Sequence, residues 1–148
     1  MDPKAILDKL NSMTGNTLME TLHIRFTQVG EDFLVATMPV DSKVHQPMGL
    51  LHGGATAALA ESVGSAAAHL FSGSPGAEVR GVEISANHLR SKREGQVEAR
   101  AVAIHKGRTT QLWEIRVTDE QGQLLSICKL NCIILPKKQR TVDEKEMD

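Results

Sequence analysis

Aromatic residues are scarce in this chain of 148 residues, with three Phe, one Trp and no Tyr. Proteins that bind single-stranded nucleic acid stack the bases on aromatic side chains, so this class is disfavoured. Charge of one sign is also missing, because 17 Lys and Arg stand against 18 Asp and Glu. A net charge of -1 gives no general attraction for nucleic acid or for an anionic membrane, and neither is expected as a partner.

Cysteines and long apolar runs are equally few. Two cysteines, Cys128 and Cys132, are too few for a disulfide framework or a zinc ribbon. Their spacing places both thiols on one face of a strand, which favours packing over redox or metal chemistry. No apolar run is long enough to span a membrane, and the amino-terminal residues lack the apolar core of a secretory signal. The sequence therefore predicts a cytoplasmic protein.

Several hydrolase motifs are absent. The chain has no HExxH pair of histidines, no GxSxG elbow and no phosphate-binding P-loop. Zinc, serine and nucleotide hydrolases are therefore disfavoured, and no metal ion is expected.

The hydrophobic pattern predicts one domain over residues 1–136. Asp2 and Pro3 are typical of a helix start, and Gly15 follows the end of the apolar stripe. An apolar–polar alternation begins at Leu22 and is interrupted by a turn at residues 30–32, which predicts a hairpin. An Ala-rich helix is expected over residues 53–71. The charged tail, residues 137–148, is expected to be mobile.

Short turns then separate four predicted strands, at 79–90, 95–106, 109–119 and 123–135. Because the turns are short, an antiparallel meander is expected. On the preceding helix, Leu59, Val63 and Leu70 share one face, opposite a side made of small residues. The α+β fold predicted from this pattern is a curled antiparallel sheet around a long central helix, with that apolar face buried. The small side of the helix and the open sheet edges favour a homo-oligomer.

Glu61 is the one carboxylate between Asp41 and Glu78, and it stands in a helix of small and apolar residues. An ionised carboxylate in such surroundings is costly unless it is hydrogen-bonded, which makes it a candidate base or nucleophile. It could equally be a helix residue that reaches solvent. Ser65 lies one turn later and could orient the carboxylate or a water molecule, or simply pack as a small residue.

The segment His52-Gly53-Gly54 stands where the loop becomes this helix. The first N–H groups of a helix have no intrahelical acceptor, and glycine lets a substrate carbonyl approach them closely. A tight turn capped by His52 would explain the same residues. Gln46, in the preceding loop, could present its amide to a bound carbonyl or lie in solvent.

Basic residues gather at 88–93 and at 105–110, at opposite ends of one predicted strand. Such clusters suit phosphate groups, although charged turns are often only solvated.

Read together, three segments resemble the hotdog-fold acyl-CoA thioesterases. They are QPMGLLHGG at 46–54, AESVGS at 60–65 and NHLRS at 87–91, and the resemblance extends over about 22–135. It is strongest to the branch that contains 1,4-dihydroxy-2-naphthoyl-CoA hydrolase and the proofreading thioesterase of enterobactin synthesis. The resemblance implies a hotdog fold, dimers that pair into tetramers, and active sites at the dimer interface.

The resemblance also implies roles for individual residues. Glu61 would be the nucleophile or general base, and the Gly53 N–H would polarise the thioester carbonyl. His52 and Gln46 would position the substrate, and Ser65 matches the hydroxyl residue one turn beyond the carboxylate. His88, Arg90 and Ser91 match the segment that meets coenzyme A, and local charge adds Lys92 and Arg108 as candidates for its phosphates.

The function expected from this resemblance is hydrolysis of an aromatic acyl-CoA to the free acid and CoA. The substrate could be 1,4-dihydroxy-2-naphthoyl-CoA on the route to menaquinone. No cofactor is expected, because the CoA moiety belongs to the substrate. Two alternatives stay open: a proofreading thioesterase acting on a misacylated carrier protein, and a non-catalytic acyl-CoA binding module.

Overall fold

The computed structural model describes residues 1–137, so the predicted mobile tail lies, apart from Lys137, outside the described residues. The elements in chain order are α1 (Pro3–Ser12), α2 (Leu18–Thr21), β1 (Arg25–Val29), β2 (Phe33–Val40), the 3₁₀ turn η1 (Ser42–Val44), α3 (Gly53–Leu70), β3 (Glu78–His88), β4 (Gly95–Lys106), β5 (Thr110–Thr118) and β6 (Leu124–Leu135). The predicted helices, hairpin and strands are therefore present with bounds that differ by at most a few residues. The short helix α2 was not predicted.

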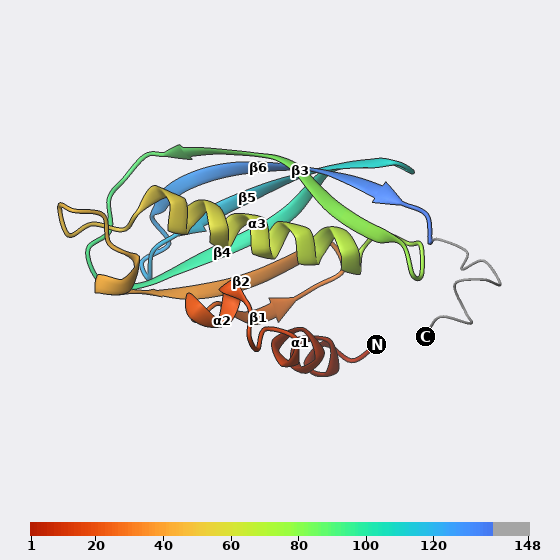
Figure 1. Cartoon of the computed structure of the whole chain (residues 1–148), viewed down its shortest axis with the longest axis horizontal. Helices are drawn as coiled ribbons and strands as arrows, with labels where there is room; N and C mark the ends of the chain where they lie inside the picture. Colours follow the sequence, from red (N-terminus) through yellow and green to blue (C-terminus); the bar gives the residue numbers. More distant parts are fainter. Residues whose placement is uncertain (138–148) are drawn as a thin grey trace, which may run out of the picture.

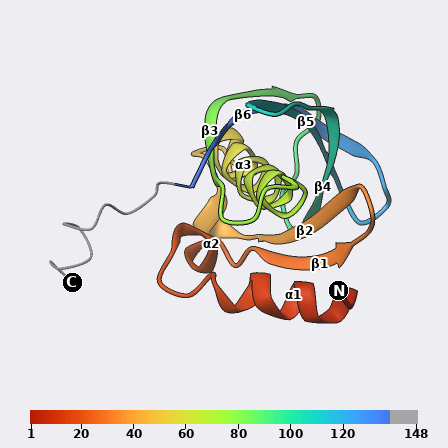
Figure 2. The same ribbon diagram turned by 90° about the vertical axis from the view of Figure 1, so that its right-hand side faces the viewer.

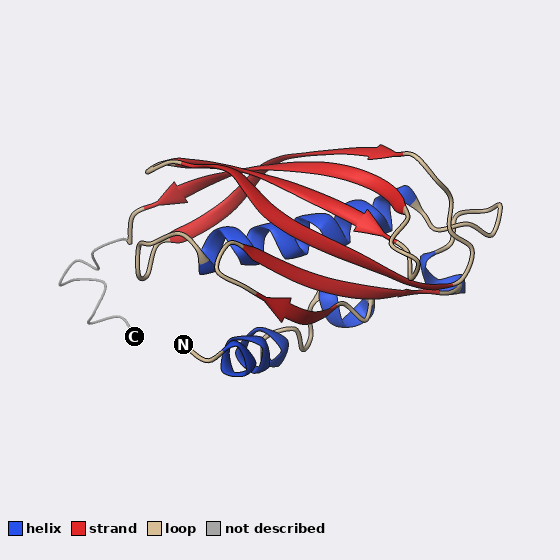
Figure 3. Cartoon of the chain, turned by 180° about the vertical axis from the view of Figure 1, so that it is seen from behind, coloured by secondary structure: helices blue, strands red, loops and turns tan. Residues whose placement is uncertain are grey.

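One antiparallel sheet of six strands, in the order β1-β2-β4-β5-β6-β3, forms the body of the molecule. The sheet curls around α3, which is clearest in the view along that helix (Figure 2) and from behind (Figure 3). In Figure 1, α3 runs across the concave side of the strands. This is the α+β hotdog architecture expected from the sequence.

The predicted four-strand meander is wrong for its first strand. Strands β4, β5 and β6 do follow one another, but β3 pairs with β6 and forms an edge of the sheet, while β4 pairs with β2. The six residues at 89–94 therefore cross from one edge to the middle of the sheet. Six extended residues reach about 20 Å, which exceeds three strand spacings of about 4.8 Å, so a short connection does not require adjacent strands.

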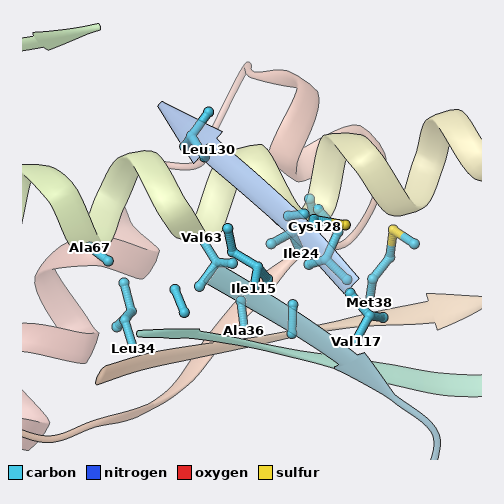
Figure 4. Packing of buried hydrophobic residues seen from close by; sticks show 14 of the residues in the cluster. Ile24, Leu34, Ala36, Met38, Val63, Ala67, Ile115, Val117, Cys128 and Leu130 are labelled. Atoms are coloured by element: carbon cyan, nitrogen blue, oxygen red, sulfur yellow. The ribbon is translucent and has the colours of Figure 1, made fainter. Parts of the chain in front are cut away.

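Helix α3 packs on the sheet through Leu59 and Val63, which are completely buried. Figure 4 shows Val63 and Ala67 pointing towards the side chains of the strands. Leu70, expected on the same buried face, is only half-buried because it is the last helical residue. The next residue, Phe71, covers this end of the core instead, with its ring stacked on Trp113 at a centroid distance of 5.9 Å.

The amino-terminal helix lies outside the sheet, against β1 (Figure 2). Asp2 caps it as predicted, accepting from the Ala5 N–H at 3.2 Å, but the helix ends at Ser12 rather than just before Gly15. The Asn11 side chain accepts from the N–H of Phe26 and donates to its carbonyl, both at 2.9 Å. These two hydrogen bonds fix α1 to the edge strand β1. No helix within residues 1–137 has the length and apolarity to cross a membrane.

Candidate active site

A cavity of about 310 Å³ opens at the amino-terminal end of α3. Its walls come from the loop before α3, from the first turns of that helix, from the crossover segment 89–94 and from the start of β6. The lining residues are Gln46, Leu50, Leu51, Gly53, Thr56, His88, Leu89, Arg90, Ser91, Lys92, Leu125 and Ser126. The loop is tied to the crossover by a bond from the Leu51 N–H to the Lys92 carbonyl at 2.7 Å. The His45 Nε2 also donates to the Arg93 carbonyl at 2.7 Å.

The start of α3 leaves one backbone donor for a ligand. His52 is the N-cap, and its Nδ1 accepts from the Gly54 N–H at 2.8 Å. An Nδ1 acceptor requires the proton of a neutral ring to be on Nε2, so exposed His52 presents a donor to its surroundings. The Gly53 N–H, at the first helical position, has no acceptor within residues 1–137 and lies at the cavity wall. The positive end of the helix dipole strengthens this donor for an anionic oxygen.

His88 lies beside Gly53, and a buried serine holds its ring there. Its Nδ1 lies 2.9 Å from the Ser126 Oγ, and Ser126 is only 2% exposed. A β carbon at position 53 would lie 2.7 Å from the His88 Nε2, so only glycine leaves room for the ring there. His88, Ser126 and the Gly53 backbone therefore form one polar wall of the cavity.

Gln46 enters the same cavity from the loop. Its Oε1 accepts a hydrogen bond from the Met48 N–H, which fixes the side-chain amide within its own loop. The amide nitrogen retains its two hydrogens as donors for a ligand carbonyl.

The basic residues divide into two groups. Arg90 and Lys92 line the cavity, but Lys92 forms an ion pair with Glu120, which holds the pKa of that carboxyl below its ordinary value. Arg108 lies in the turn after β4, whereas Lys92 precedes the start of β4. A strand of 12 residues is about 36 Å long, so Arg108 and the cavity lie at opposite ends of the sheet, as the sequence predicted.

Glu61 does not line this cavity. It lies eight residues after Gly53, which is about 12 Å along the helix axis. Its half-buried carboxylate lies over the β3–β6 pair, beside Gly81 and Cys132, and it forms no hydrogen bond or ion pair with residues 1–137. Ser65 follows one turn later on the same helix and is also half-buried.

The two cysteines are unpaired and buried, as expected for packing thiols. Burial raises the pKa of Cys128 to about 11, from an ordinary value of 9.0. Burial, together with the negative charge of Glu61, also raises the pKa of Cys132 to about 11. Both thiols are therefore protonated at neutral pH and are poor nucleophiles.

The structure thus brings together part of the predicted site within one chain. Gln46 and Gly53 share the cavity with His88, Arg90, Ser91 and Lys92, and His52 stands just outside it at the helix cap. Glu61 and Ser65 lie further along α3, and Arg108 is remote. Within the described part of the chain, no group of three His, Cys, Asp or Glu side chains is arranged to hold a metal ion.

Sequence reasoning missed two residues at these positions. Ser126 shares the inward face of β6 with Cys128 and Leu130, and a hydroxyl on an apolar face is a signal that could have identified it. Gly81 carries no such signal, because its contact with Glu61 depends on a pairing between distant strands.

Comparison with known proteins supports the assignment that the fold and site suggest. Residues 48–126 match the thioesterase superfamily. The chain is 46% identical over 132 residues to a 1,4-dihydroxy-2-naphthoyl-CoA hydrolase from Escherichia coli, covering 89% of this chain and 96% of that protein. It is 47% identical over 129 residues to the proofreading thioesterase EntH of Cronobacter turicensis, covering 87% and 93%.

Solved structures agree with these relatives. The crystal structure of thioesterase HI1161 from Haemophilus influenzae superposes with a TM-score of 0.87 at 40% identity, covering 90% of this chain and 93% of that one. A mutant of thioesterase PA1618 from Pseudomonas aeruginosa gives a TM-score of 0.85 at 45% identity, covering 88% and 94%. The chain belongs to the thioesterase superfamily. It is therefore a thioester hydrolase rather than a non-catalytic binding module.

Proposed function

We propose that this thioesterase hydrolyses an aromatic acyl-CoA, with 1,4-dihydroxy-2-naphthoyl-CoA of menaquinone synthesis as the first candidate. The observation that carries the proposal is the cavity in which the free Gly53 N–H and the Gln46 amide meet basic residues. Two donors suit a thioester carbonyl, and Arg90 suits the phosphates of CoA. The named relative from Escherichia coli supports the choice of substrate. A cytoplasmic location, where CoA thioesters are made and used, stays part of this proposal.

In the proposed mechanism, the Gly53 N–H and the Gln46 amide polarise the thioester carbonyl. Glu61 then acts either as the nucleophile or as the general base. Either the carboxylate adds to the carbonyl carbon and expels the thiolate, leaving an anhydride that water hydrolyses, or it removes a proton from water that attacks directly. Both routes consume one water and yield the free acid and CoA. Neither requires a metal ion or a cofactor.

One chain cannot supply both halves of this site, because Glu61 stands about 12 Å along α3 from Gly53. We therefore propose a homodimer in which Glu61 and Ser65 of one protomer complete the cavity of the other. The outer edge of β3 has no strand partner within residues 1–137, and Val82 on this strand is 62% exposed. An open edge with apolar side chains suits pairing with a second copy.

Pairing of such dimers into a tetramer would carry Arg108 of one protomer towards the cavity of another. Light scattering at micromolar concentration should give the mass of a tetramer. A monomer under these conditions would contradict the proposed assembly.

Carrier-protein proofreading is the second candidate, favoured by the relatives named EntH. A carrier protein presents pantetheine without the adenosine 3′-phosphate of CoA. Its thioesters should therefore react without help from Arg90 or Lys92, whereas CoA thioesters should need them.

The experiment that tests the proposal is thiol release from a panel of aromatic and aliphatic acyl-CoAs and from the matching acyl carrier proteins. We expect aromatic acyl-CoAs to give the highest kcat/KM. Faster turnover of aliphatic CoA thioesters would contradict the aromatic assignment, and faster turnover of carrier-protein thioesters would favour the second candidate.

A further inference from the structure

Gly81 occupies an inward position of β3 at which a side chain would meet Glu61. A β carbon built on Gly81 would lie 2.8 Å from the Glu61 Oε1 and 3.8 Å from its Cδ. Real β carbons do not approach an oxygen this closely, so any side chain at position 81 requires the carboxylate to move. The absence of a side chain at position 81 therefore leaves free the space that the carboxylate occupies.

Backbone conformation does not explain the glycine. Gly81 is not among the residues with positive φ, so an L-residue can adopt its conformation. A glycine inside a strand also weakens that strand, and the neighbouring inward positions of β3 are filled by Val79, Ile84 and Ala86. Glycine in a strand is typical where the backbone bulges or where another group approaches closely. Here the register shifts between Gly81 and Glu83, and the approaching group is a carboxylate.

Two side chains of β6 lie close to the space that Glu61 occupies. Cys132 stands opposite Gly81 on β6 and is buried, and Leu130 Cδ1 would lie 3.5 Å from a β carbon at position 81. No hydrogen bond from residues 1–137 holds the carboxylate in place. Among the described residues, the open space beside Gly81 is therefore what admits the carboxylate at this position.

We propose that Gly81 is a positioning residue for thioester hydrolysis, which aims the Glu61 carboxylate by leaving open the space beside β3. This inference rests on the proposed role of Glu61. A misplacement of about 1 Å in a reacting group can lower the rate on the order of a hundredfold. Because the proposed substrate contacts come from Gly53, Gln46 and Arg90 and the proposed attack comes from Glu61, the loss should appear in kcat rather than in KM.

The test is a double-mutant cycle between positions 81 and 61. Gly81→Ala should lower kcat by about 10- to 100-fold, with KM changed by less than about twofold. Aspartate is one methylene shorter than glutamate, so Glu61→Asp makes room for the new methyl. In the Glu61→Asp background, Gly81→Ala should then lower kcat by less than about threefold. The control is Gly15→Ala, since a β carbon at Gly15 has no neighbour within 4 Å, and this variant should keep the activity of the wild type.

Two results would overturn the inference: Gly81→Ala with nearly wild-type kcat, or an equal loss in both backgrounds, which would indicate a general effect on the strand or the assembly. A crystal structure of Gly81→Ala gives a readout that does not depend on turnover, and an unmoved carboxylate would also overturn it. If Gly81→Ala unfolds, Glu61→Ala/Gly81→Ala should recover the wild-type melting temperature, because the new methyl then meets no carboxylate. A melting temperature that stays low would show that the methyl does not clash with Glu61, and would overturn the inference. Wild-type turnover by Glu61→Gln would instead contradict the proposed function itself.

Discussion

Glu61 is a carboxylate with an unusual position: half-buried, without a hydrogen-bond partner within residues 1–137, and beside a thiol that stays protonated. A free carboxylate in small and apolar surroundings keeps its lone pairs available for a substrate or a water molecule. A structural carboxylate would be expected to form an ion pair or a cap. The environment at the residue scale therefore favours a chemical role.

Removing this charge tests that role. Glu61→Gln and Glu61→Ala should lower kcat at least about a hundredfold, because either change removes the base or nucleophile. Melting temperatures should change little, since the carboxylate makes no hydrogen bond or ion pair with residues 1–137. His52→Ala should cost less, because the carboxylate and the Gly53 donor stay in place. Steady-state thiol release measures kcat for all three variants. A larger loss of kcat for His52→Ala than for Glu61→Ala would mean that His52, and not Glu61, is the base or nucleophile.

The ion pair between Lys92 and Glu120 predicts opposite effects of substitutions at these two positions. Arg90→Ala and Lys92→Ala should each raise KM for an acyl-CoA by about two- to tenfold, with kcat nearly unchanged. Glu120→Gln should lower that KM, because Lys92 is then free to meet a phosphate. A pantetheine thioester, which lacks the nucleotide, is the control and should respond to none of them. Identical responses of both substrates would show that these residues do not contact the nucleotide.

Candidate residues with a distinctive local context can be found from the sequence. Glu61 stood out by its isolation, and Gly53 by its place at a helix start. The roles of Gly81 and Ser126 depend instead on contacts across the sheet, with Glu61 and His88 respectively. Their partners stand 20 and 38 residues away in the sequence, so no local pattern records those contacts.

At the scale of elements, α3 and the sheet stabilise each other through a few completely buried side chains, Leu59 and Val63 among them. The period of the helix and the alternation in the strands predicted these elements with nearly correct bounds, because both depend on neighbouring residues. The place of β3 was not predictable in this way. Strand order is decided by packing over the whole curled sheet, and a six-residue connection is compatible with several orders.

The central place of α3 predicts a large effect from a small change. Leu59→Ala should lower the free energy of unfolding by about 2–5 kcal/mol, because a completely buried side chain leaves a cavity between helix and sheet. His69→Ala, at an exposed position of the same helix, is the matched control and should change it by less than about 0.5 kcal/mol. Urea denaturation measures both free energies, and similar values would contradict the packing of Leu59 between α3 and the sheet.

At the scale of the whole molecule, one chain provides the cavity and the carboxylate at separate places on the same helix. In the proposed dimer, a second copy at the open edge of β3 brings them together. The sequence indicated an oligomer through the small side of α3 and the sheet edges. The resemblance placed the active site at a dimer interface, but the separation of about 12 Å between Gly53 and Glu61 along one helix has meaning only once the cavity is known.

Complementation between two inactive variants tests this central claim most directly. Glu61→Ala and the double variant Gln46→Ala/His52→Ala should each be nearly inactive alone. When they are co-expressed with different tags, each mixed dimer should contain one intact site, made of Glu61 from one protomer and the cavity of the other. Random pairing makes half of the dimers mixed, so thiol release should recover to about a quarter of the wild-type rate. Activity of the purified mixed dimer no higher than the sum of the two variants would contradict the account.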